Sequence, residues 1–226
     1  MLHKPLASVF MAMFFAFTLF FFFMVEFNLI ALAFLKIGIP AHYVFSALFA
    51  TLLGSFVNIP VKKIHGTAVV RERGTITFFG FQYVIPRTKR NVTVIAVNLG
   101  GAVFPVVISG YLLLKTGLYF STLTGVVFMT AVCYRLARPI NGVGIALPFF
   151  VPPVLAALLS VMISHNHAPV IAYVSGTLGA LIGADLLNLK QIGKLNAPVA
   201  SIGGAGTFDG IFLTGILAVL LSVFLS

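Results

Sequence analysis

Two aspartates in the C-terminal part of the chain are its strongest candidates for chemistry. Asp185 and Asp209 both lie inside long apolar stretches, in a chain with 4 acidic residues against 14 Lys and Arg. An ionisable side chain inside a membrane segment is costly, so such a residue marks a candidate functional site. Two adjacent carboxyls can share one proton, so that one activates water while the other protonates a leaving group. The pair therefore predicts acid–base hydrolysis, with Asp185 and Asp209 as the catalytic residues.

The spacing around the two aspartates predicts a common depth in the membrane. Asp185 lies five residues before Lys190, and Asp209 lies five residues after Gly204. With a rise of about 1.5 Å per residue, each carboxyl would lie on the order of 7 Å inside the same boundary. Small residues on both segments would let the two helices approach closely. They are Gly176, Gly179, Ala180, Gly183 and Ala184 on the first segment, and Gly206, Gly210 and Gly215 on the second.

The same acids also fit transport or a structural role. Proton and ion pathways combine Asp with Asn among broken helices, so a proton- or ion-coupled transporter or channel is the second hypothesis. We expect four polar residues near the acids to line a hydrated inner cavity: Asn58, Asn98, Asn188 and Ser201. Of these, Asn98 and Asn188 are expected to support the acids. A membrane carboxylate can also cap a helix or satisfy a buried neighbour. A non-catalytic membrane protein is therefore the third hypothesis.

Other polar motifs predict no metal, nucleotide or cofactor. His165-Asn166-His167 offers two imidazoles without a neighbouring carboxylate or thiol, whereas a zinc site needs three or four ligands. Gly203-Gly204-Ala205-Gly206 lacks the Gly-Lys-Ser/Thr signature of a phosphate-binding loop. Glu26, the third acid in an apolar stretch, is expected either inside the membrane or at its outer interface.

The composition predicts a polytopic, all-α membrane protein. Hydrophobic residues make up 60% of the 226 residues, charged residues make up 8%, and the mean hydropathy is +1.14. The single Cys133 excludes an intramolecular disulfide. A membrane span needs about 20 apolar residues, which predicts one transmembrane domain over residues 1–226. Its seven expected spans cover residues 7–35, 40–59, 93–114, 117–134, 150–164, 170–189 and 206–226.

The distribution of basic residues predicts the orientation of these spans. Alternate loops place twelve Lys and Arg on one side and only Lys36 and Lys115 on the other. Basic loops stay in the cytoplasm, so we expect a multi-pass inner-membrane protein with a cytoplasmic N-terminus and an external C-terminus. Because the basic residues flank apolar runs, the net charge of +10 indicates membrane lipid as a partner and not nucleic acid.

Two segments between spans are expected to have their own structure. Residues 61–91 form a basic cytoplasmic loop, in which the β-branched and aromatic run 75–85 predicts a short β-hairpin. This hairpin would lie at the lipid headgroups or accept an extended peptide at its edge. Residues 139–153, rich in Gly and Pro, are expected to form either a broken or re-entrant element or a plain turn.

The C-terminal order resembles that of the presenilin and signal-peptide-peptidase group of intramembrane aspartyl proteases. An aspartate on a sixth span, a cytoplasmic connection and a glycine-rich approach to an aspartate on a seventh span follow in the same sequence. The resemblance implies that Asp185 and Asp209 are the catalytic dyad of an aspartic-type endopeptidase with a transmembrane peptide as substrate. Gly204 and Gly206 would correspond to that group's Gly-x-Gly-Asp motif, with two additional residues before the acid. The chain is also similar to a family of uncharacterised prokaryotic seven-span membrane proteins.

Overall fold

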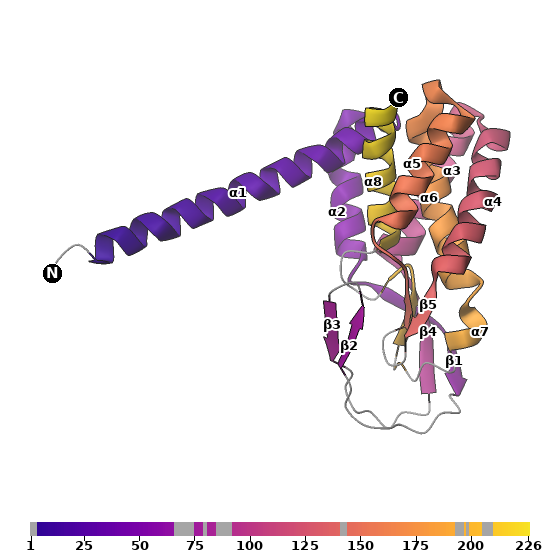
Figure 1. The fold of residues 1–226 in the computed structure, drawn as a ribbon, viewed down its shortest axis with the longest axis horizontal. Helices are drawn as coiled ribbons and strands as arrows, with labels where there is room; N and C mark the ends of the chain where they lie inside the picture. The colour runs from indigo at the N-terminus through magenta and orange to yellow at the C-terminus, as the bar shows by residue number, and fades with distance from the viewer. Residues whose placement is uncertain are drawn as a thin grey trace.

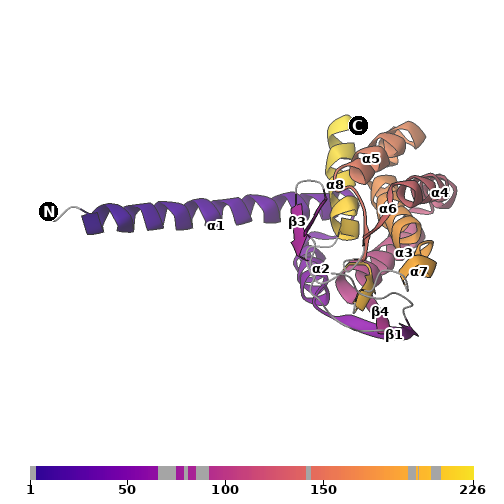
Figure 2. The same ribbon diagram turned by 60° about the horizontal axis from the view of Figure 1, so that its bottom comes forward.

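The computed structural model describes residues 4–65, 75–78, 81–84, 92–140, 144–192, 197, 199–204 and 210–226. Its longer helices are α1 (Lys4–Lys36), α2 (Ala41–Gly54), α3 (Phe104–Thr116), α4 (Tyr119–Leu136), α5 (Val151–Ile163), α6 (Ala168–Ala180) and α8 (Gly210–Leu225). Short helical elements are η1 (Leu99–Val103), η2 (His165–His167), η3 (Leu181–Leu186) and α7 (Leu189–Ile192). Helices α2 to α6 and α8 stand side by side as a bundle (Figure 1), while α1 projects sideways from it (Figure 2).

Four helical stretches within the described ranges are long and apolar enough to cross a membrane. They are Phe14–Lys36, Leu99–Thr116, Tyr119–Leu136 and His165–Gln191, and three shorter apolar helices accompany them: Ala41–Gly54, Val151–Ile163 and Gly210–Leu225. Each of these seven stretches falls largely within one of the seven expected spans. The structure is therefore mostly helical and has four candidate membrane-spanning helices, in agreement with the predicted class.

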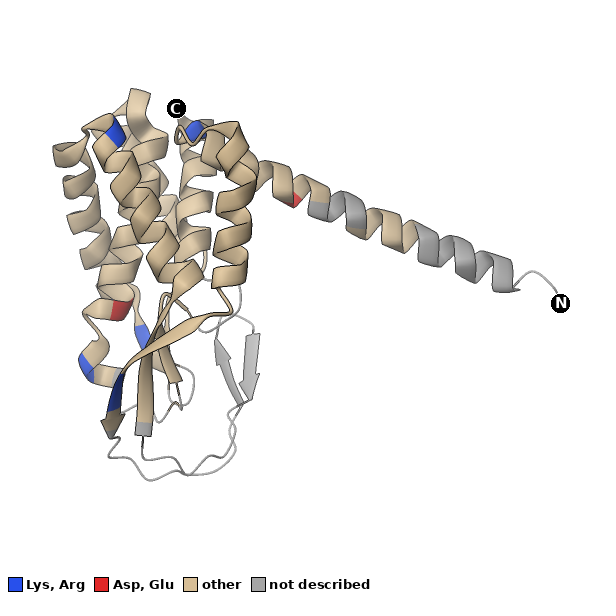
Figure 3. Cartoon of the chain, turned by 180° about the vertical axis from the view of Figure 1, so that it is seen from behind, with Lys and Arg blue, Asp and Glu red and all other residues tan. Residues whose placement is uncertain are grey.

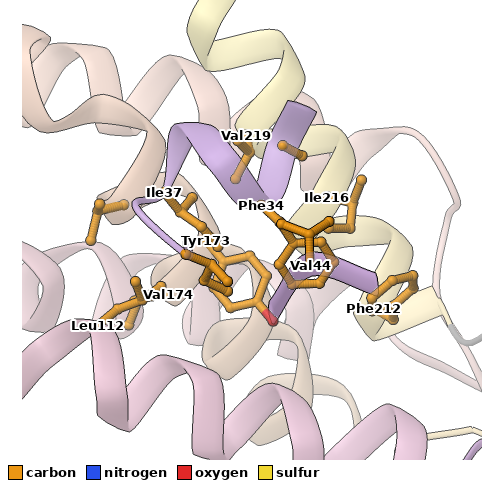
Figure 4. Close-up of a cluster of buried hydrophobic side chains, with 12 residues drawn as sticks. Phe34, Ile37, Val44, Leu112, Tyr173, Val174, Phe212, Ile216 and Val219 are labelled. Carbon is orange, nitrogen blue, oxygen red and sulfur yellow. The ribbon is translucent and has the colours of Figure 1, made fainter. Parts of the chain in front are cut away.

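Helix α6 forms the centre of the bundle. Almost every residue from Ala168 to Ala180 is buried, because α4, α5, α8 and α3 all pack against it. Tyr173 is fully buried in an apolar cluster with Phe34 of α1, Val44 of α2 and Ile216 of α8 (Figure 4). Apolar side chains that meet in this way leave little freedom in the relative position of the helices, so α6 is a rigid support for the residues at its end.

A three-stranded sheet lies at one end of the bundle. Strand β4 (Val92–Asn98) pairs antiparallel with β1 (Asn58–His65) and parallel with β7 (Val199–Ile202). The expected spans 40–59 and 93–114 are therefore too long, because residues 58–59 and 93–98 belong to strands. Their β-branched residues, such as Val94, Ile95 and Val97, favour a strand, and an apolar run alone does not distinguish a buried strand from a helix.

Two short hairpins complete the fold. β2 (Thr75–Phe78) pairs antiparallel with β3 (Phe81–Val84), which confirms the hairpin predicted in the basic loop. Residues 66–74, 79–80 and 85–91 of this loop lie outside the described residues. β5 (Arg138–Ile140) pairs antiparallel with β6 (Gly144–Ala146), just before α5. The described part of residues 139–153 thus consists of strand residues of this hairpin, a short connection and the first residues of α5.

Candidate functional site

Asp185 lies on a π-helical turn, η3, which continues α6 toward the sheet. In a regular α-helix the residue seven positions after Thr177, Ala184, would face the same direction as Thr177. A π-helical turn holds one extra residue, so Asp185 takes that direction instead. Thr177 packs directly against Gly215 of α8. The π-helical turn therefore directs Asp185 toward the side of α6 on which α8 lies.

The carboxylate of Asp185 is hydrogen-bonded to the turn that follows β7. The backbone N–H of Gly203 donates to Asp185 Oδ2 over 2.7 Å. Gly203 has a φ of 87°, and a Cβ at this position would stand 2.6 Å from the backbone nitrogen of Ala102. Only glycine fits this left-handed conformation and this close approach without strain. Gly204, the last described residue before Asp209, has a φ of 101°.

A polar cluster joins the three strands beside this turn. Asn98 is buried, and its Nδ2 donates to the carbonyl of Ser55 over 2.7 Å and to Asn58 Oδ1 over 3.0 Å. Asn98 Oδ1 in turn accepts from the N–H of Gly101 over 2.8 Å, which caps η1. Ser201 Oγ of β7 donates to the same Asn58 Oδ1 over 2.5 Å. The structure therefore places Asn98 and Ser201 in contact with Asn58.

Asn188 acts on the helix that carries Asp185. Its Nδ2 donates to the carbonyl oxygens of Gly183 over 3.1 Å and Ala184 over 2.9 Å, and its Oδ1 accepts from Gln191 Nε2 over 2.7 Å. Carbonyl groups at the end of a helix lack intrahelical partners, so Asn188 satisfies two of them. These hydrogen bonds hold the end of η3 in place.

Other predicted site residues are only partly described. Asp209 and Gly206 lie outside the described residues, which resume at Gly210, the first residue of α8. The pairing of Asp185 with Asp209 therefore stays a prediction. His167 Nδ1 lies 3.3 Å from Ser164 Oγ, and within the described ranges no three His, Cys, Asp or Glu residues gather as a metal site would require.

The described basic residues are unevenly distributed along the bundle (Figure 3). Lys62 and Lys63 belong to β1, Arg138 to β5 and Lys190 to α7, all at the sheet end. At the opposite end Lys115 Nζ donates to the carbonyl of Gly38 over 2.5 Å. Asp185 therefore lies at the basic end of the molecule.

A comparison with protein families matches residues 52–221 to the model described as "Protein of unknown function (DUF1614)". The chain belongs to this family. The DUF1614 match begins in α2 and ends in α8, so it includes the sheet, Asp185 and the segment that leads to Asp209, but not α1. No curated protein and no solved structure matches the chain. Membership in an uncharacterised family is thus confirmed, whereas the resemblance to presenilins receives no support from the comparisons.

Two contributors to this DUF1614 site were missed by sequence reasoning. Ser55 supplies a backbone carbonyl to Asn98, and Gly203 supplies the N–H to Asp185. A hydrogen bond made by a backbone carbonyl cannot be predicted from the type of side chain at that position. Gly203 did carry a signal, since two consecutive glycines between a β-branched run and a helix are typical of a turn with positive φ.

Proposed function

We propose that the chain is an intramembrane aspartyl hydrolase, in which Asp185 and Asp209 form a catalytic pair that cleaves a transmembrane peptide. The observation that carries the proposal is the hydrogen bond from Gly203 N–H to Asp185 Oδ2. This hydrogen bond holds Asp185 next to Gly203, at the start of the short segment that contains Asp209. Asp209 lies six residues after Gly203 and directly before α8.

The register of α6 against α8 supports a common depth for the two acids. A Cβ on Gly176 would stand 3.5 Å from Thr214 Cγ2 and 3.6 Å from Ala218 Cβ. These contacts place Gly176 level with position 216, midway between Thr214 and Ala218. The helices run antiparallel, so Gly210, the first residue of α8, lies level with position 182 of α6 and η3. Asp185 follows position 182 by three residues, and Asp209 directly precedes Gly210.

In the proposed reaction the acid pair shares one proton. The ionised carboxyl removes a proton from water, whose oxygen adds to the peptide carbonyl. The protonated carboxyl gives its proton to the amide nitrogen as the C–N bond breaks, so a new carboxyl and a new amine leave. The pair is restored with its single proton, and no metal or cofactor takes part in this scheme.

The substrate segment would bind as an extended strand along β7. Within the described ranges β7 has a strand neighbour on one side only, and its residues Val199 to Ile202 carry no charge. The opposite edge strand, β1, contains Pro60, Lys62 and Lys63, which disfavour the addition of another strand. Addition at β7 would place an unwound peptide next to Gly203 and hence next to Asp185.

The proposal includes an orientation in the inner membrane. The four long and three shorter apolar helices would form seven spans, with the sheet end in the cytoplasm and the C-terminus outside. The basic side chains at the sheet end support this orientation, because basic loops stay on the cytoplasmic side. The helices α2, α5 and α8 are short, so each would reach the cytoplasmic boundary of the membrane together with the strand or turn that adjoins it.

Peptide cleavage by the purified full chain tests the proposal. Reconstituted protein should cut a helical single-span peptide near its cytoplasmic boundary, and Asp185→Asn or Asp209→Asn should each abolish the cut. Asparagine still offers a side-chain oxygen to Gly203 N–H, so loss of cleavage in Asp185→Asn would reflect chemistry and not folding. Thr124→Val, on the exposed side of α4, is the matched control and should cleave normally. Cleavage that persists in either aspartate variant would reject the mechanism.

A further inference from the structure

An open apolar groove runs along α4, which stands at the edge of the bundle (Figure 1). One part of the groove is lined by residues of α4 alone: Leu123, Thr124, Val127, Phe128 and Ala131. The adjoining part shares Phe128 and Ala131 and continues toward the sheet end between α4 and the start of α5, where Val151 and Leu155 line it. The proposed chemistry uses neither part of this groove.

Two arginines stand at the sheet end of the groove. Arg135 lies in the last turn of α4 and lines the groove, and Arg138 begins β5 three residues later. Both side chains are exposed, and neither has a hydrogen bond or ion pair with any described residue. The residues that line the groove include no Asp or Glu. The groove therefore combines an apolar length with a positively charged end that no described acid neutralises.

The length of the groove matches one leaflet of a membrane. Phe128 and Arg135 are seven residues apart, so they follow one face of α4. From Leu123 to Arg135 the helix rises about 18 Å, close to half of a hydrocarbon layer about 30 Å thick. The hydroxyl of Thr124 donates to a carbonyl of its own helix over 3.0 Å, so its hydrogen is satisfied within α4. An acyl chain that begins at Arg135 would therefore run along an apolar surface.

The side chains on this face favour a lipid over a further helix. Helices in a bilayer associate where small residues let their backbones approach closely. In α4 the small Gly125 faces the bundle, where an added Cβ would stand 2.8 Å from Ser175 Cβ of α6. The groove face instead exposes Leu123, Val127 and Phe128. The planar fork of donors on an arginine matches the oxygens of a phosphate group. A phospholipid therefore fits both the apolar length and the charged end.

We propose that the groove of α4 and α5 is a binding site for an anionic phospholipid of the leaflet at the sheet end. Arg135 binds the lipid phosphate, Arg138 adds positive charge beside the headgroup, and one acyl chain lies along Phe128. Basic sites between membrane helices bind such headgroups. The two arginines favour a lipid with net negative charge over a zwitterionic lipid, because they repel the ammonium group of the latter. This inference depends neither on the proposed hydrolysis nor on the proposed orientation.

A single tryptophan can report on the groove, because the chain contains no Trp. The full chain with Phe128→Trp is reconstituted in phosphatidylcholine vesicles, and phosphatidylglycerol or phosphatidylcholine with brominated acyl chains is added as a quencher. The expected result is a preference for phosphatidylglycerol on the order of fivefold, which falls close to equality when Arg135→Gln is added. Phe120→Trp, an exposed position at the opposite end of α4, is the control reporter and should show no preference.

A matched charge variant separates the groove from the basic end as a whole. Lys63→Gln removes an exposed positive charge of β1, outside the groove, and should leave the preference of the Phe128→Trp chain unchanged. Arg135→Lys should retain part of the preference, which a misfolded chain would not do. Equal quenching by the two lipids in the Phe128→Trp chain would overturn the proposal. An equal loss of preference in Lys63→Gln and Arg135→Gln would also overturn it, in favour of unspecific attraction to the basic end.

Discussion

At the residue scale, hydrogen bonds and one close backbone contact connect the strands to the candidate acid. Asn98 holds the carbonyl of Ser55 and the N–H of Gly101, and the backbone of Gly101 and Ala102 packs against Gly203. Gly203 then donates to Asp185. A side chain that satisfies several buried polar groups fixes the backbone around it. Asn98 therefore positions the turn that holds the carboxylate, without touching the carboxylate itself.

Removal of the Asn98 amide should destabilise the fold. Asn98→Ala leaves the carbonyl of Ser55 and the N–H of Gly101 without this partner, and an unsatisfied buried group costs about 1–3 kcal/mol. We expect a loss of about 2 kcal/mol in the free energy of unfolding in detergent micelles, measured by denaturant titration. Asn28→Ala, at an exposed amide on α1, should change it by less than about 0.5 kcal/mol. Equal stability of the two variants would disprove the role of Asn98.

The sequence predicted part of this arrangement. The topology led us to expect Asn58, Asn98 and Ser201 near one membrane boundary, and the structure places Asn98 and Ser201 in contact with Asn58. Their function could not be predicted in the same way. Asn98 was expected to line a hydrated cavity, whereas it caps η1 and satisfies backbone groups.

At the element scale, glycine allows α4 to lie directly on α6 and η3. A Cβ on Gly179 would overlap the side chain of Met129 and stand 3.1 Å from the Met129 carbonyl carbon. Gly183 lies equally close to the backbone of α4 near Thr130. Without a strong hydrophobic force between helices in lipid, such close backbone packing holds them together. The position of η3, and of the acid on it, depends on this contact.

A larger side chain at Gly179 should therefore separate α4 from α6. Gly179→Leu is expected to destabilise the fold by at least about 2 kcal/mol, since overpacking costs about 1–3 kcal/mol even where the surroundings can adjust. Gly110→Leu on α3, where an added Cβ meets no atom within 4 Å, is the matched control. Thermal unfolding in detergent compares the two variants. A similar midpoint for both would contradict the packing described here.

Sequence patterns predicted the helices better than their ends. The apolar runs gave the positions of the seven helices, but 93–98 was expected in a span and forms β4 instead. Hydropathy measures apolarity, and a buried strand satisfies that measure as well as a helix. The π-helical turn η3 was not predicted either, because a shift from i→i+4 to i→i+5 hydrogen bonds has no distinctive composition.

At the scale of the whole molecule, the charges define two different ends. The sheet end carries Lys62, Lys63, Arg138 and Lys190, together with Asp185, while Lys115 lies at the other end. The orientation predicted from the basic loops rested on all fourteen Lys and Arg, including those outside the described residues. Within the described part of the bundle, the basic residues of the larger group lie at the sheet end and Lys115 lies at the opposite end (Figure 3), while Lys4 begins the projecting helix α1.

This asymmetry predicts which end an external reagent can reach. In intact cells a membrane-impermeant thiol reagent should label Lys115→Cys but not Lys63→Cys, because basic segments stay in the cytoplasm. After the membrane is opened, Lys63→Cys should label as well. The native Cys133 is buried and should give little background. Labelling of Lys63→Cys in intact cells would reverse the proposed orientation.

The pairing of the two acids is the central claim, and chemical cross-linking measures it most directly. Asp185→Cys and Asp209→Cys are combined in a chain that carries Cys133→Ala, and a short bifunctional thiol reagent is added in native membranes. Because the π-helical turn directs position 185 toward α8, this pair should cross-link efficiently, whereas Leu186→Cys, at an exposed neighbouring position, should cross-link poorly with Asp209→Cys. Equal cross-linking of the two pairs, or none with position 185, would contradict a catalytic dyad.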